Sequence, residues 1–327
     1  MHWLITGGAG FIGSHLAEAL VGRGDRVTVL DNLSTGRLAN LSTLESRAGF
    51  RFVQGSILDR ALLVPLVQDC DGVYHLAAAV GVKLIISQPV ETIETNVFGT
   101  ETLLSVAAAY RRRVLIASTS EVYGKNNTVP FREDDDSVFG STQKSRWSYA
   151  CSKKLDEFLA LAYFRERKLP VTIARFFNTV GPRQTGEYGM VLPRFVRQAL
   201  RQDPITIYGD GSQSRCFTHV DEAVHAVTKL MDRVDTAGEV FNLGGQTEVT
   251  IVELARKVIE MSVSRSQLRY IPYEEAYEKG FEDMQRRVPD VSKLKHWIGY
   301  APSDGLETII RSVIDYHRAH PELVNSH

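Results

Sequence analysis

A glycine-rich segment near the start of the chain most constrains its fold. Residues 1–6 form an apolar stretch that predicts a strand, glycines follow at positions 7, 8, 10 and 13, and residues 14–21 predict a helix. Glycines at such a junction allow a tight turn and a close approach of the backbone to a pyrophosphate, while the start of the helix offers free N–H groups to the anion. The segment therefore predicts a dinucleotide-binding turn in an α/β protein.

An acidic residue after the second predicted strand indicates which dinucleotide binds. Residues 26–30 predict that strand, and Asp31 follows at the position where a carboxylate reaches the adenosine ribose diol. Such a carboxylate disfavours a 2′-phosphate, so we predict NAD as the cofactor. Arg37 lies nearby and can accept a phosphate, which leaves NADP as the alternative.

A tyrosine and a lysine four residues apart form a candidate base. Tyr149 and Lys153 fall on one face of a predicted helix. The unperturbed pKa of a tyrosine is about 10, and a nearby cation favours the phenolate. We therefore expect Lys153 to lower the pKa of Tyr149 far enough for the phenol to act as a base.

Composition narrows the class of protein. The chain has 327 residues, 43% of them hydrophobic, and a net charge of −1, which predicts a folded chain with a large core or two domains and no nucleic-acid partner. The three cysteines are scattered and the nine histidines show no ligand spacing, so neither a disulfide framework nor a metal site is predicted. No secretory signal and no apolar run of membrane-spanning length is found, so we expect a cytoplasmic protein without membrane contact.

Strands and helices alternate up to about residue 175, which predicts a Rossmann-type, doubly wound parallel sheet. Ligands of such sheets lie beyond the carboxyl ends of the strands. Asp31, His75, Thr119 and Asn178 all follow predicted strands, so these residues are expected to converge on one cleft.

These motifs together resemble the extended, nucleotide-sugar-modifying branch of the short-chain dehydrogenase/reductases, the NAD-dependent epimerase/dehydratase family. One departure is Ser56, where the family usually has an aspartate that contacts the adenine. The resemblance covers essentially the whole chain and is carried further by residues 75–78, 96–100, 118–124, 175–183 and 208–215.

The resemblance implies a second, smaller and discontinuous α/β domain for the substrate. Residues 1–177 and 216–245 are expected to form the NAD-binding domain, and residues 178–215 and 246–327 the nucleotide-sugar-binding domain. It also implies a homodimer that assembles through the helices carrying Asn96 and Tyr149. On the second of these helices, Leu155, Phe158, Leu159 and Ala162 form an apolar stripe, which equally fits packing within the domain.

The resemblance further implies chemistry at the C4 position of a nucleotide sugar. Thr119 is expected to hold the C4 hydroxyl, Tyr149 to remove its proton, and NAD to take the hydride, while Lys153 binds the nicotinamide ribose. The product of this step is a 4-keto sugar. A carboxylate on C5 is then β to a carbonyl and is easily lost as carbon dioxide.

The residues after Thr119 discriminate between reactions. Sugar 4,6-dehydratases carry an Asp-Glu pair there, whereas this chain has Ser120 and Glu121, which disfavours the assisted loss of hydroxide. UDP-glucuronate decarboxylases share the Thr-Ser-Glu sequence, and simple UDP-galactose 4-epimerases lack the carboxylate. We therefore predict a UDP-glucuronate decarboxylase, with a UDP-sugar 4-epimerase acting on UDP-glucose or UDP-glucuronate as the alternative. A 4,6-dehydratase is less favoured, and a non-catalytic dinucleotide sensor is a remote alternative because Tyr149 and Lys153 are both present.

Residues 110–113, 146–150 and 280–290 resemble the lipid-A-modifying decarboxylases and the plant UDP-apiose/UDP-xylose synthases. By that resemblance Arg287 serves the substrate carboxylate, for which the planar guanidinium is well suited, although many epimerases place an arginine here for the diphosphate. The remaining implied cofactor contacts are Gly7, Gly10, Phe11, Ile12, Gly13, Asn32, Ile57, Leu76, Ala77, Ala78 and Asn96, and the remaining implied contacts with a UDP-sugar are Asn178, Val191, Ile207, Tyr208 and Arg215.

Overall fold

The computed structural model describes residues 1–81, 88–186, 190–276, 282 and 284–325. A seven-stranded sheet forms its centre, and every pairing in that sheet is parallel. Its strand order is β11-β6-β5-β4-β1-β2-β3. The strands are β1 (His2–Thr6), β2 (Arg26–Asp31), β3 (Phe50–Gln54), β4 (Gly72–His75), β5 (Arg113–Thr119), β6 (Val171–Phe176) and β11 (Val240–Leu243).

The order of the strands places the site. From β1 the chain runs outward through β2 and β3, returns, and then runs the other way from β4 through β6, so the direction reverses between β1 and β4. This is the doubly wound arrangement, in which a crevice opens at the reversal beyond the strand ends. The predicted fold class is thereby confirmed.

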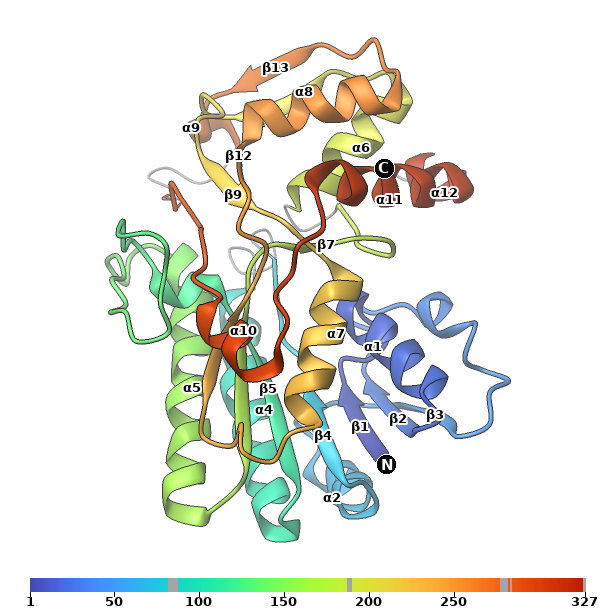
Figure 1. Cartoon of the computed structure of the whole chain (residues 1–327), viewed down its shortest axis with the longest axis vertical. Helices are drawn as coiled ribbons and strands as arrows, with labels where there is room; N and C mark the ends of the chain where they lie inside the picture. Colours follow the sequence, from blue (N-terminus) through green and yellow to red (C-terminus); the bar gives the residue numbers. More distant parts are fainter. Residues whose placement is uncertain (82–87, 187–189, 277–281, 283, 326–327) are drawn as a thin grey trace.

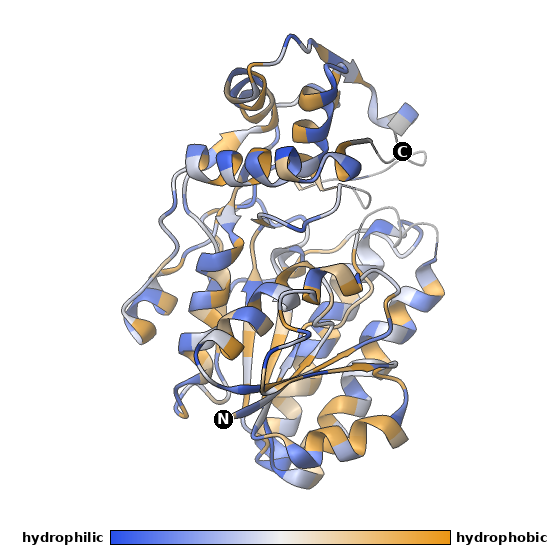
Figure 2. Ribbon diagram, turned by 90° about the vertical axis from the view of Figure 1, so that its right-hand side faces the viewer, coloured by the Kyte–Doolittle hydropathy of each residue, from blue (hydrophilic) through white to orange (hydrophobic). Residues whose placement is uncertain are grey.

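Helices cover both faces of the sheet (Figure 1). Alternate residues of β1 point to opposite faces: Trp3 and Ile5 belong to one apolar cluster and Leu4 to another. The first cluster is closed by α1 (Phe11–Gly22), α7 (Val220–Met231) and α10 (Ser292–Ile298), and the second by α2 (Arg60–Asp69), α4 (Pro89–Tyr110) and α5 (Arg146–Arg167). Figure 2 shows hydrophilic and hydrophobic bands alternating along these helices, as expected when one face is turned to a core.

A smaller group of elements lies beyond the carboxyl ends of the strands, at the top of Figure 1. Its apolar cluster includes Leu192, Phe195, Leu254 and Ile310, and is separate from the two clusters of the sheet. The helices are α6 (Val191–Arg201), α8 (Ile251–Ser262), α9 (Tyr273–Ala276), α11 (Leu306–Ala319) and α12 (Pro321–Asn325). The short strands pair as β7 (Thr179–Val180) with β10 (Thr218–His219), β8 (Ile205–Tyr208) with β13 (Leu268–Ile271), and β9 (Ser214–Cys216) with β12 (Glu248–Thr250).

The predicted domain boundaries remain a prediction. One element of the predicted second domain packs on the sheet: in α10, Leu294 belongs to the first cluster, and the Trp297 ring lies 5.6 Å from that of Phe241 on β11. Two short 3₁₀ helices, η1 (Leu38–Leu41) and η2 (Ser120–Tyr123), complete the elements near the crevice. Among the described helices, none is long and apolar enough to cross a membrane.

Candidate active site

A cleft of about 450 Å³ opens beyond the ends of β1, β2, β4, β5 and β6. It brings together most of the predicted site residues, which come from segments far apart in the sequence. The predicted residues that line it are Gly7, Gly10, Phe11, Ile12, Gly13, Asp31, Asn32, Ile57, Leu76, Ala77, Ala78, Thr119, Ser120, Glu121, Tyr149, Lys153, Asn178 and Arg287.

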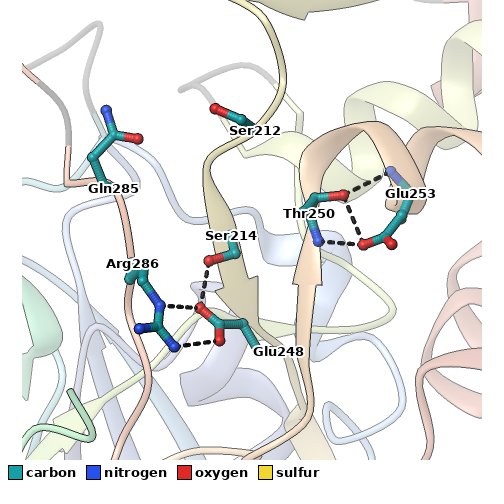
Figure 3. Close-up of a pocket in the computed structure, with 7 residues that line it drawn as sticks. All are labelled: Ser212, Ser214, Glu248, Thr250, Glu253, Gln285 and Arg286. Atoms are coloured by element: carbon teal, nitrogen blue, oxygen red, sulfur yellow. Dashed lines mark hydrogen bonds and ion pairs between the residues drawn. The ribbon is translucent and has the colours of Figure 1, made fainter.

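A second hollow of similar volume, about 460 Å³, lies against β9 and β12 and is more open (Figure 3). Its side chains are paired with one another: Arg286 donates two hydrogen bonds to Glu248, and Thr250 forms a capping box with Glu253 at the start of α8. None of the predicted site residues lines it. The cleft at the sheet is therefore the candidate active site.

The glycine-rich turn leaves no room for side chains. Gly7 has a positive φ of 73°, and a Cβ at this position would lie 2.7 Å from the backbone nitrogen of Ala77. A Cβ at Gly13 would lie 2.3 Å from the carbonyl oxygen of Gly7. The turn therefore holds α1 directly against β1, with the start of the helix facing the cleft, as a dinucleotide pyrophosphate requires.

Asp31 is fixed at the end of β2 by two backbone donors. Its Oδ2 accepts a hydrogen bond from Ala9 N at 2.9 Å, and its Oδ1 accepts one from Leu33 N at 2.8 Å. Burial raises the pKa of Asp31, although both N–H groups oppose this shift. A carboxylate held here suits a ribose diol, while Arg37 lines the same end of the cleft and keeps its backbone bonded to Ala9.

The strand β5 and the 3₁₀ helix η2 carry the predicted Thr119, Ser120 and Glu121. Thr119 ends β5, and its hydroxyl oxygen accepts a hydrogen bond from Glu121 N at 3.3 Å. The same hydroxyl lies close enough to the phenol of Tyr149, which projects from α5, to act on its pKa. Thr119 and Tyr149 thus meet in the cleft, as predicted, close enough to act on one substrate hydroxyl.

The predicted effect of Lys153 on the pKa of Tyr149 remains a prediction. The pKa of Tyr149 is raised, first by burial and then by the negative charges of Glu121 and Asp156, and the hydroxyl of Thr119 only partly offsets them. Lys153 donates a hydrogen bond to Asp156, with Nζ and Oδ2 2.9 Å apart. The spacing of Tyr149 and Lys153 indicated a shared face of the helix, but not the buried carboxylate one turn further along.

Glu121 lies in a cluster of arginines. Its Oε2 accepts a hydrogen bond from Arg146, and its Oε1 lies 3.3 Å from Nη1 of Arg287. Burial alone would raise the pKa of Glu121, but Arg146, Arg287 and Arg215 outweigh it and lower the pKa to about 2. Glu121 is therefore ionised at neutral pH, and a second carboxylate entering the cleft would meet the arginines as well.

The sequence motif gave Arg146 no role, yet its guanidinium pairs with Glu121 beside the cleft. It is almost fully buried and stands three residues before Tyr149 on α5. This spacing places both side chains on one face of the helix, which was the available signal. Arg183, another quoted residue, lines the cleft and forms an ion pair with Glu18 at 2.7 Å.

Asn96 does not line the cleft; it lies behind it. Its side chain accepts a hydrogen bond from Ala79 N at 2.8 Å and donates one to the Ser152 hydroxyl at 3.2 Å. Asn96 thereby joins the segment after β4 to the helix that carries the catalytic pair. Its predicted direct contact with the cofactor remains a prediction.

Four predicted substrate contacts also lie outside the cleft lining: Val191, Ile207, Tyr208 and Arg215. Ile207 is fully buried in the upper apolar cluster, because alternate residues of β8 face that core. The Tyr208 ring lies under the guanidinium of Arg194, 4.2 Å from it. Arg215 donates a hydrogen bond to Ser214 O at 2.8 Å, but its charge still acts on Glu121.

The fold and the site define a Rossmann-type enzyme that holds a dinucleotide beside a tyrosine and a threonine. The chain belongs to the GDP-mannose 4,6 dehydratase family, whose model matches residues 4–313.

The chain is also similar to individual proteins over most of its length. The chain is 45% identical to a UDP-N-acetyl-alpha-D-glucosaminuronate decarboxylase of Bacillus cytotoxicus, over 96% of this chain and 97% of that protein. It is 38% identical to UDP-glucuronic acid decarboxylase 1 of Arabidopsis thaliana, over 96% of this chain and 69% of that protein. It superposes with a TM-score of 0.87 and 29% identity on a UDP-glucuronic acid 4-epimerase of Bacillus cereus in complex with UDP-glucuronic acid and NAD, covering 98% of this chain and 99% of that one.

The arginine cluster predicts a pH-dependent stability. Glu121→Gln is expected to lower the free energy of unfolding at neutral pH by about 3 kcal/mol, because the folded pKa of about 2 lies below the ordinary glutamate value of 4.5. A depressed folded pKa contributes stability that is complete above the unfolded value and is lost as pH falls through the folded value. Urea unfolding at a series of pH values is therefore expected to show a difference that shrinks between about pH 4.5 and 2.

The matched control is Glu166→Gln, which removes an exposed carboxylate on the same helix as Arg146. It is expected to change the free energy of unfolding by less than about 0.5 kcal/mol at any of these pH values. If the free energies of unfolding of the wild type and Glu121→Gln differed by the same amount at every pH, the assigned ionisation of Glu121 would be contradicted.

Proposed function

We propose that the chain is an NAD-dependent UDP-hexuronate decarboxylase, with UDP-glucuronate as the predicted substrate. The observation that carries this proposal is the charge beside Tyr149, where Glu121 is surrounded by Arg146 and Arg287. Both guanidiniums are charged, planar donors, which suit a sugar carboxylate better than a neutral hydroxymethyl group. The decarboxylase relatives support the same substrate class.

The residues of the cleft fit a reaction that begins at C4. Thr119 and Tyr149 hold the C4 hydroxyl between them, and the Tyr149 oxygen takes its proton. Bound NAD supplies a hydride acceptor for C4 and a positive charge that favours the phenolate. Gly7, Gly13 and Asp31 would hold the pyrophosphate and the ribose of that cofactor.

Loss of carbon dioxide follows from the C4 ketone, because the carboxylate on C5 is then β to a carbonyl. Arg287 lines the cleft and is the proposed partner of this carboxylate. Glu121 stays ionised next to Arg287, so its proposed role is to hold the guanidinium in place while carbon dioxide leaves. The acid that protonates C5 is not assigned to Glu121, since a pKa of about 2 makes it a poor proton donor at neutral pH.

A second candidate substrate is the corresponding 2-acetamido sugar, UDP-N-acetylglucosaminuronate. The relative with 45% identity over nearly both full lengths bears that name. Both sugars carry the same carboxylate on C5, so the arginine cluster fits either. The 4-epimerase alternative uses the same Thr119, Tyr149 and Lys153 and is supported by the superposition on an epimerase.

Product analysis tests the proposal. Incubation with NAD and either UDP-hexuronate is expected to release carbon dioxide and yield a UDP-pentose, or its 2-acetamido counterpart, identified by mass and NMR. UDP-glucose is the neutral control and is expected to remain unchanged. A product of unchanged mass with an inverted configuration at C4 would instead establish the epimerase.

A change of the proposed base is a separate test. Tyr149→Phe is expected to reduce turnover by roughly 10²- to 10⁴-fold.

Glu121→Gln separates the two stages of the reaction. The change removes the charge that holds Arg287 but keeps Thr119 and Tyr149, so C4 oxidation is expected to proceed while the following step slows. Rapid mixing should therefore show NADH absorbance that accumulates in the variant and stays low in the wild type. Turnover equal to that of the wild type, with no accumulation, would refute the role of Glu121.

We also propose a homodimer that assembles through α4 and α5, and a cytoplasmic location. Large apolar side chains are exposed on these two helices: Phe98 at 58%, Leu155 at 49% and Phe158 at 62%. In the predicted stripe, Leu159 instead packs against the second apolar cluster of the sheet. Adjacent exposed apolar residues on neighbouring helices favour contact with a second copy, and the three free thiols are in keeping with a reducing compartment.

Phe158→Glu tests the dimer. A charge in the centre of an apolar interface is expected to shift the protein to monomers, because an unpaired buried carboxylate is costly. Light scattering coupled to size exclusion measures the molecular mass of the wild type and the variant. Val234→Glu, at a site 81% exposed after α7, is the control and should leave the mass unchanged; a monomeric wild type would refute the proposal.

A further inference from the structure

A buried ion pair lies one helical turn beyond the catalytic tyrosine. Lys153 and Asp156 are three residues apart on α5, and their side chains are only 2% and 0% exposed. Tyr149, Lys153 and Asp156 follow at intervals of four and three residues, so all three project from one face of the helix. The ammonium that the reaction needs beside Tyr149 is therefore held by a carboxylate of the same helix.

Next to Asp156 lies Thr100 of α4, whose hydroxyl opposes the rise that burial causes in the pKa of Asp156. Hydrogen bonds lead from Thr100 to the glycine-rich turn. Thr100 Oγ1 also lies 3.1 Å from His75 Nε2, and His75 Nδ1 lies 2.7 Å from the hydroxyl of Thr6. Thr6 is the last residue of β1, immediately before Gly7.

The charge state of His75 limits how these hydrogen bonds are arranged. Burial and the charge of Lys153 lower the pKa of His75 to about 3, so the ring is neutral, with one donor and one acceptor nitrogen. One ring nitrogen therefore donates and the other accepts in its contacts with Thr100 and Thr6.

Stability alone does not account for Asp156. Its Oδ1 has no hydrogen-bond partner among the described residues, and a buried carboxylate with an unpaired oxygen is costly. Buried ion pairs contribute little net stability, since desolvation of both charges offsets their attraction. The free-energy cost of burying Asp156 is explained if its carboxylate acts on the charged groups beside it.

We propose that Asp156 is a positioning residue for Lys153, whose carboxylate holds the ammonium in place and offsets the positive charge that Lys153 presents to Tyr149. This inference rests on the proposed function in one respect, that Tyr149 is the base of the reaction. Asp156 then sets the pH above which the phenol can take the C4 proton.

Other charged and polar groups also face Tyr149 and Asp156. Tyr149 faces Glu121 of η2 and Arg146 of its own helix, besides the hydroxyl of Thr119 on β5. Asp156 faces Lys153 and Glu157 on α5, and Thr100 on α4. Asp156 raises the pKa of Tyr149, so its neutralisation lowers that pKa while the charges of Glu121 and Arg146 stay constant.

Asp156→Asn tests the proposal, because it removes the charge and keeps the shape. Tyrosine labelled with ¹³C at the ring carbon that bears the hydroxyl reports the phenolate by NMR, and Tyr149→Phe identifies the signal. With NAD bound, the Tyr149 signal is expected to titrate at lower pH in Asp156→Asn than in the wild type. Where turnover rises with pH, turnover divided by its plateau value is also expected to be about threefold or more higher in the variant than in the wild type.

Coincident titration curves, or a curve of the variant at higher pH, would overturn the proposal. Asp315→Asn, an exposed change on α11, is the matched control and should titrate like the wild type. If Asp156→Asn does not fold, Asp156→Ser decides instead: it also removes the charge and is expected to shift the titration of Tyr149 in the same direction. The titration needs no sugar, so it tests the role of Asp156 even if the protein turns over no UDP-hexuronate. A failure to turn over any UDP-hexuronate would refute only the proposed function.

Discussion

The cleft depends on charges that the protein keeps out of water. Glu121 remains ionised in a buried position because Arg146, Arg287 and Arg215 act on it from different segments of the chain. Arg146 comes from α5, whereas Arg287 comes from the region after α9, more than a hundred residues later. The pairing with Glu121 therefore joins the segment between α9 and α10 to the helix that carries Tyr149, directly beside β5.

Two carboxylates surround the phenol, and their partners differ. Glu121 is paired with arginines, which remain charged at any pH at which the protein is folded, whereas Asp156 is paired with a lysine. Both carboxylates raise the pKa of Tyr149. In the proposed mechanism, the positive charge of a bound oxidised cofactor favours the phenolate, so binding of that cofactor would activate Tyr149 as a base.

The parts of the fold that follow from local patterns were predictable from the sequence. Glycines between strand and helix, and a carboxylate after the second strand, place the dinucleotide end of the cleft, because strand order and chain direction then determine where these residues meet. The Lys153–Asp156 pair was not predictable, although only three residues separate the two, since its strength depends on burial by α4 and β4. The predicted contact of Ile207 was carried over by resemblance alone, and in the structure this side chain is fully buried in the upper apolar cluster.

The charge balance of the cleft also bears on how a decarboxylase could release its product. With a hexuronate bound, the substrate carboxylate would join Glu121 at the guanidinium of Arg287. Departure of carbon dioxide leaves the negative charge on the enolate oxygen at C4, and protonation of C5 then removes it. The product therefore lacks the carboxylate through which the substrate would contact Arg287. On this argument, Glu121 keeps Arg287 in position through the part of the cycle in which no sugar carboxylate is present.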